Sequence, residues 1–138
     1  MPFAEEFDAA AGQFDALAED VAALLAPVTA AAGPMVLLGG ASTEPVQLAI
    51  ERGKRSSRQA AAALRALAAV SRERAAVCRA SQAAERIYRA ATVVHAEAMQ
   101  QWRQGRDRFE LDPDRYPDPG PPPPAPRPPA PPPPWVEY

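Results

Sequence analysis

The sequence predicts an all-α protein, an antiparallel helical hairpin with a long second helix followed by a disordered proline-rich tail. Alanine dominates residues 1–110, and alanine is the best helix former because it loses no side-chain entropy on entering a helix. Near the N-terminus, apolar residues recur every seven positions, which is typical of a coiled-coil seam. Of the 18 prolines, 14 lie between Pro113 and Pro134, so the foldable part ends near residue 110.

Residues 1–32 are predicted to form a first amphipathic helix, which is acidic. One heptad position holds Phe7, Phe14 and Val21, and the second holds Leu17 and Leu24. A seam of this kind, sustained for nearly four heptads, packs against a neighbouring helix. These five side chains are therefore the predicted seam of the hairpin.

Prolines and glycines predict where the first helix ends. Pro27 either stops it or kinks it and lets it run to residue 32, and Gly33 with Pro34 ends it in both cases. Residues 33–45 are the predicted connecting loop. Thr43 is suited to cap the next helix, with Pro45 tolerated in its first turn.

Residues 46–110 are predicted to form one long basic helix, because this stretch contains no proline. A bend is expected near residues 53–57, where a glycine is followed by two serines. A short connection makes the two helices antiparallel neighbours, and the first can cover only about half of the second. The apolar stripe left uncovered predicts a partner interface, an argument for assembly with a second copy or a related helical protein. That interface comprises Tyr88, His95, Met99, Trp102 and Phe109.

Charge is segregated along the chain. Residues 1–45 carry seven acids and no base, whereas residues 46–109 carry 13 bases against five acids. The opposite charges favour pairing of the two helices within the hairpin. The basic helix also leaves open a third function, nucleic-acid binding through phosphate neutralisation, although no aromatic or glycine interleaving typical of RNA-binding segments accompanies it.

The residue types that carry catalysis are scarce. Cys78 and His95 are the only cysteine and histidine, and at 17 residues apart on one helix they lie roughly 25 Å from each other. They cannot form a nucleophile–base pair within one subunit, and no cluster has metal-ligand spacing. We therefore expect no catalytic residue, no metal and no cofactor.

The tail, residues 111–138, is predicted to be disordered, extended and largely polyproline II, because proline removes the backbone donor and fixes φ. It ends in an aromatic tip containing Trp135 and Tyr138. Two interpretations stay open: the tail is a spacer, or a partner docks on Trp135 and Tyr138.

The same sequence predicts a cytoplasmic protein without a membrane anchor. Its acidic N-terminus lacks the basic and apolar regions of a secretory signal. The longest apolar run, residues 30–38, is interrupted by Gly33 and Pro34 and is too short to cross a bilayer.

The end of the long helix, from Tyr88 to Phe109, resembles the C-terminal helix of small actinobacterial type VII (ESX) secretion substrates, especially the EspC-like group related to the WXG helical hairpins. In the EspC-like pattern, an aromatic residue lies seven residues before a tryptophan and a basic residue follows. Here His95 stands at the aromatic position, Trp102 at the tryptophan and Arg103 after it. The resemblance implies a helical hairpin that is exported without a cleavable signal peptide.

The leading hypothesis is a non-enzymatic helical assembly protein, a type VII secretion-associated substrate or accessory acting through helix–helix association. The alternative is an intracellular adaptor whose helical body joins one complex while its proline-rich tail recruits another.

Overall fold

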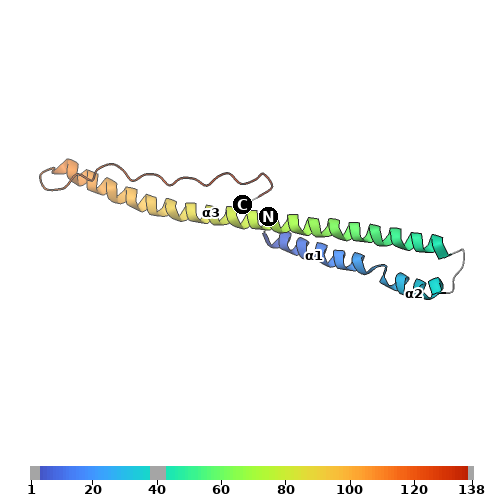
Figure 1. Cartoon of the computed structure of the whole chain (residues 1–138). Helices are drawn as coiled ribbons and strands as arrows, with labels where there is room; N and C mark the ends of the chain where they lie inside the picture. The colour runs from blue at the N-terminus through green and yellow to red at the C-terminus, as the bar shows by residue number, and fades with distance from the viewer. Residues whose placement is uncertain (1–3, 38–42, 137–138) are drawn as a thin grey trace. The chain divides into compact units, whose positions relative to one another are not determined.

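The chain is all-helical, as the sequence predicts. The computed structural model describes residues 4–37 and 43–136, with side chains for 4–31 and 44–136. Its helices are α1 (Ala4–Ala23), α2 (Ala26–Leu37) and α3 (Thr43–Leu111), and the described ranges contain no strand (Figure 1). The chain forms two compact units, Met1–Cys78 and Arg79–Tyr138, and α3 contributes to both.

A break separates α1 from α2 just before Pro27. In a continuous helix the missing Pro27 N–H would leave the Ala23 carbonyl without its partner, and α1 ends at Ala23. The chain turns over the next two residues, so that Pro27 stands in the first turn of α2, where no N–H is needed. Thr29 closes the turn by donating its N–H and its hydroxyl to the Leu25 carbonyl, both at 2.8 Å.

The predicted loop over residues 33–45 is too long. α2 continues through Gly33 and Pro34 to Leu37, so the prediction that these two residues end the first helical segment was wrong. The three alanines before them are strong helix formers, and a proline removes one helical hydrogen bond without forbidding the others. α3 begins at Thr43 with Pro45 in its first turn, and residues 38–42 lie outside the described part.

α3 runs without interruption through residues 53–57, where the sequence predicts a bend. Gly53 has a packing role instead. A Cβ atom built on it would lie 3.1 Å from Cδ1 of Leu25, so the glycine leaves room for this leucine at the α1–α2 break.

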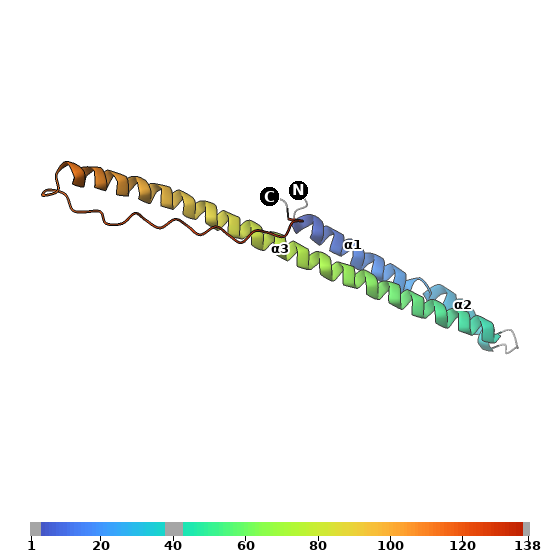
Figure 2. The same cartoon turned by 90° about the horizontal axis from the view of Figure 1, so that it is seen from above.

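The core of the first unit is a double line of alanines. α1 and α2 lie along the first part of α3 in both views (Figure 1, Figure 2). The pairing is antiparallel, because Asp15 pairs with Arg72 whereas the later Leu25 meets the earlier Gly53. The buried residues repeat every seven positions on both helices: Ala4, Ala11 and Ala18 on α1, and Ala61, Ala68 and Ala75 on α3. Small side chains at a contact let two helices approach more closely than large ones do.

The seam of α1 differs from the predicted one at its second heptad position. Phe7, Phe14 and Val21 are half-buried beside the alanines. Leu17 and Leu24, however, are 50% and 64% exposed. Each stands one residue before an inward-facing position. The space between the two helices, rather than the hydrophobicity of the side chain, decides which residue enters a narrow seam.

In the second unit, the tail is extended over residues 112–136, with no helix or strand. A turn follows α3: the N–H groups of Arg115 and Tyr116 donate to the Asp112 carbonyl at 3.2 and 3.1 Å. The tail then runs back along the second part of α3 (Figure 2). The sequence predicts a disordered tail, whereas here its backbone makes specific contacts with the helix.

Candidate interaction surfaces

One edge of the α1–α3 pair is charged. Asp15 follows the half-buried Phe14, Arg72 follows the buried Ser71, and the two form an ion pair across the edge. The same heptad position on α3 carries an arginine in each neighbouring repeat, namely Arg58, Arg65, Arg72 and Arg79. The ion pair is well exposed, so it contributes at most about 1 kcal/mol and acts mainly to set the register.

The opposite edge of the pair carries large apolar side chains, with the charged Arg74 one heptad after Leu67. Leu17 precedes the buried Ala18, and Leu67 precedes the buried Ala68. In a heptad, the residue before one seam position and the residue after the other lie on opposite flanks, so the leucines share the edge opposite the ion pair. With Leu24 and Val70 they form what we call the leucine edge: Leu17, Leu24, Leu67 and Val70, with 50%, 64%, 49% and 46% of their surfaces exposed.

The second half of α3 presents a face on which rings alternate with small residues. Its half-buried positions follow the heptad spacing of three and four, and we call them the distal face: Tyr88, Ala91, His95, Ala98, Trp102, Gly105 and Phe109. Each of the first three rings is therefore followed by a small residue, Ala91, Ala98 or Gly105, which leaves a shallow gap that we call a notch. In the first part of α3, one inward position of each heptad is instead alanine, and the other holds Leu64, Ser71 and Cys78.

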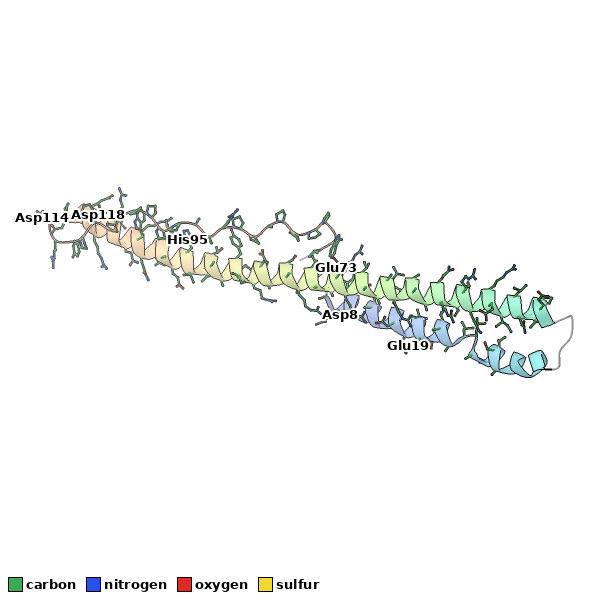
Figure 3. The ribbon with its side chains drawn as sticks, in the orientation of Figure 1. Asp8, Glu19, Glu73, His95, Asp114 and Asp118 are labelled. Carbon is green, nitrogen blue, oxygen red and sulfur yellow. The ribbon has the colours of Figure 1, made fainter. Side chains whose placement is uncertain are left out.

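The tail contacts this face at three of its residues in the structure. Trp102 donates its indole N–H to the Gly120 carbonyl at 2.8 Å, and His95 Nε2 lies 3.2 Å from the Pro123 carbonyl oxygen. A Cβ atom on Gly105 would lie 3.4 Å from Pro119, so the ring of Pro119 stands over the glycine notch. Figure 3 shows His95 on the side of α3 along which the tail runs.

Gly120 fixes the backbone where the tail first contacts the distal face. Its φ of +70° is a conformation that residues with a Cβ adopt only with strain. Its N–H donates to Asp118 Oδ1 at 2.9 Å while its carbonyl accepts from Trp102. The guanidinium of Arg106 lies 5.6 Å from the centre of the Trp102 ring and stacks against the donor.

Two residues of the predicted partner interface, His95 and Trp102, thus contact the tail of the same chain. Tyr88, His95, Trp102 and Phe109 belong to the distal face, and Met99 is half-buried next to it. The sequence prediction left these residues uncovered because it treated the tail as separate from the helix. Of the predicted tail-docking residues, Trp135 is half-buried and Tyr138 lies outside the described residues.

Two further features of the described part of the chain are Cys78 and a cleft beside α3. Cys78 is buried, and no group of three His, Cys, Asp or Glu side chains among the residues described could hold a metal ion. A cleft of about 520 Å³ opens at the α1–α2 break, where Leu25, Thr29, Lys54 and Arg58 contribute to its lining. Lys54 is paired with Glu51 at 3.1 Å. No helix over the described ranges has both the length and the apolar character needed to cross a membrane.

The sequence prediction missed two sets of residues that make packing contacts, the alanine seam and the distal face. The alanine seam was visible as alanine at every seventh position of both helices, but large residues drew the prediction to the next position. The distal face was visible as rings and small residues alternating at a spacing of three and four. The contact between this face and the tail could not be predicted, because nothing in a proline run indicates which edge of it will contact a helix.

Comparison of the chain with protein-family models, curated proteins and solved structures finds no match in any of the three.

Proposed function

We propose that this chain is a non-enzymatic helical assembly protein that associates with a second copy of itself through the leucine edge. The observation that carries the proposal is the asymmetry of the α1–α3 pair. One edge bears an ion pair, whereas the other exposes four large apolar side chains at heptad spacing. Apolar side chains gathered in this way favour burial against a partner.

The distribution of charge favours a second copy as that partner. α1 and α2 contain six acids and no base, and the basic side chains of the first unit all lie on α3. A two-fold axis through the leucine edge places the acidic α1 of one copy against the basic α3 of the other. Both pairs of helices in the resulting four-helix arrangement are then complementary in charge.

The test is a pair of substitutions on the leucine edge of the full-length protein. Leu17→Glu with Leu67→Glu should abolish self-association in sedimentation equilibrium, because four carboxylates would have to be buried at one two-fold interface. The matched control is Val93→Glu with Val94→Glu, since these valines are 60% and 65% exposed and lie outside the edge. The proposal is wrong if the wild type is a monomer at high concentration, or if both double variants associate equally.

The type VII secretion-associated role is part of this proposal. It rests on the resemblance of residues 88–109 to the EspC-like pattern, and helix–helix association is the activity which that resemblance implies. Export of the intact chain from an actinobacterial host that carries such a system, and its retention when the system is deleted, would support the role. Equal export with and without the system would contradict it.

A second candidate, the adaptor, is favoured by the exposure of the tail. Only about every third residue of 123–132 is half-buried, so two sides of the extended chain remain open to solvent. Removing residues 119–138 should then cost the adaptor one partner while self-association through the leucine edge persists.

A further inference from the structure

We propose that the distal face of α3 is a receptor for an extended proline-rich chain, and that its ligand in trans is the tail of a second copy of this protein. The inference is independent of the leucine edge, because every residue on which it rests belongs to the unit Arg79–Tyr138.

The repeat of the helix and the repeat of the tail nearly match. One heptad of an α-helix rises about 10.5 Å, and one turn of polyproline II, three residues, rises about 9.3 Å. The contacts follow this ratio: from Trp102 to His95 is seven residues of helix, and from Gly120 to Pro123 is three residues of tail. The Trp102 and His95 contacts are therefore one repeat apart on both the helix and the tail.

Burial along the tail has the same period. Pro123, Pro126, Pro129 and Pro132 are half-buried, whereas most residues between them are exposed. A helix with three residues per turn shows this pattern when one of its edges lies against a surface. The period of burial therefore indicates that one edge of a polyproline helix lies against α3 over several turns.

The chemistry of the contacts is that of proline recognition. Proline-rich segments offer carbonyl acceptors but few N–H donors, so a receptor can supply donors to these carbonyls while the proline rings pack against aromatic side chains. Trp102 and His95 place nitrogen atoms at the tail carbonyls of Gly120 and Pro123, three residues apart, and Gly105 supplies the notch for a proline ring. The polyproline conformation is already ordered in the free ligand, so little entropy is lost on binding.

Exchange between copies needs only a different path of the chain through residues 112–118. The contacts made in trans are those made in cis, which is why exchange of an identical element is a low-cost route to dimers. In an isolated chain the cis tail has the advantage, because its effective concentration lies in the millimolar range. Exchange therefore becomes measurable when the two sides of the contact are impaired on different chains.

Two full-length variants meet this requirement. Gly120→Val damages the tail, since a β-branched residue is strained at a φ of +70°, and it leaves the distal face intact. Trp102→Phe removes the indole donor from the distal face and leaves the tail intact. Strain of this kind should reduce docking of the altered tail by roughly 5- to 150-fold.

The experiment mixes the two variants, each labelled with one of a pair of fluorescent dyes, and measures energy transfer over a range of concentrations. We expect the mixture to associate at least about tenfold more tightly than either variant with itself, since only the mixture contains an intact face and an intact tail on different chains. A chain carrying both substitutions, mixed with Gly120→Val, is the matched control and should not show the gain.

Equal association in all combinations would assign the contact to the leucine edge and would overturn tail exchange, as would no association in any. Circular dichroism checks that each variant retains its helices. A milder pair, Gly120→Ala with His95→Phe, should give a smaller gain in the same direction, and a gain from neither pair overturns the proposal.

Discussion

At the scale of single residues, the size of a side chain matters more than its hydrophobicity in the first unit. Ala11, Ala18, Ala61 and Ala68 are almost completely buried, whereas the larger Leu17 and Leu67 beside them are about half exposed. Two helices that meet through alanine have little space between them, so a larger side chain at the seam must push them apart.

Ala68→Leu tests this argument. We expect the substitution to lower the free energy of unfolding by about 1–3 kcal/mol, the usual cost of overpacking a tight core. Ala69→Leu is the matched control, because Ala69 is exposed and leucine is nearly as good a helix former as alanine. Urea unfolding followed by circular dichroism measures both, and equal stability of the two variants would contradict the close-packed seam.

At the scale of secondary-structure elements, the end of α1 is held by a side chain of α3. The Val21 carbonyl lies in the last turn of α1, where it accepts a hydrogen bond from the Leu24 N–H at 3.3 Å and a second one from the Ser57 hydroxyl. This contact fixes the α1–α2 break against α3 without help from the seam alanines.

Ser57→Ala should therefore destabilise the first unit by about 1 kcal/mol, the typical net value of such a hydrogen bond. The neighbouring Ser56→Ala, at an exposed position, should leave stability unchanged or raise it slightly through helix propensity. Thermal unfolding distinguishes the two. A loss for Ser56→Ala as large as that for Ser57→Ala would show that the hydroxyl bond is not responsible.

The existence of the helices could be predicted from the sequence, because alanine content and the absence of proline act locally. The helix limits at Gly33 and Pro34 could not, since a strong alanine context outweighs one missing hydrogen bond. The choice between Leu17 and Ala18 for the seam depends on the distance between two helices, which no local signal reports. The docking of the tail depends on a match between the heptad repeat of α3 and the three-residue turn of the tail. Neither repeat alone indicates that the two segments will pack together.

At the scale of the whole molecule, acidic and basic charges are divided unequally between the helices. α1 carries six acids and no base, α2 carries no charged residue, and α3 carries an excess of bases, so pairing within the first unit and pairing between copies draw on the same attraction. The attraction between exposed charges is screened within a Debye length of about 8 Å at physiological ionic strength, whereas the apolar contribution of the leucine edge is not.

Self-association should accordingly weaken with salt, by several-fold between about 50 and 500 mM, and then level off at the apolar contribution. Sedimentation equilibrium at a series of salt concentrations measures the dissociation constant. Independence of salt would show that charge does not select the partner. A steep loss with no plateau would show that the leucine edge contributes little.

The alanine seam also determines how this chain can change over evolutionary time. Because the two helices approach closely, every seventh position of the seam accepts glycine, alanine or serine and little else. The outward leucines are not restricted in this way and can change as the partner surface changes. Descendants of this sequence should keep a spacing of small residues on both helices long after their large apolar residues have been replaced.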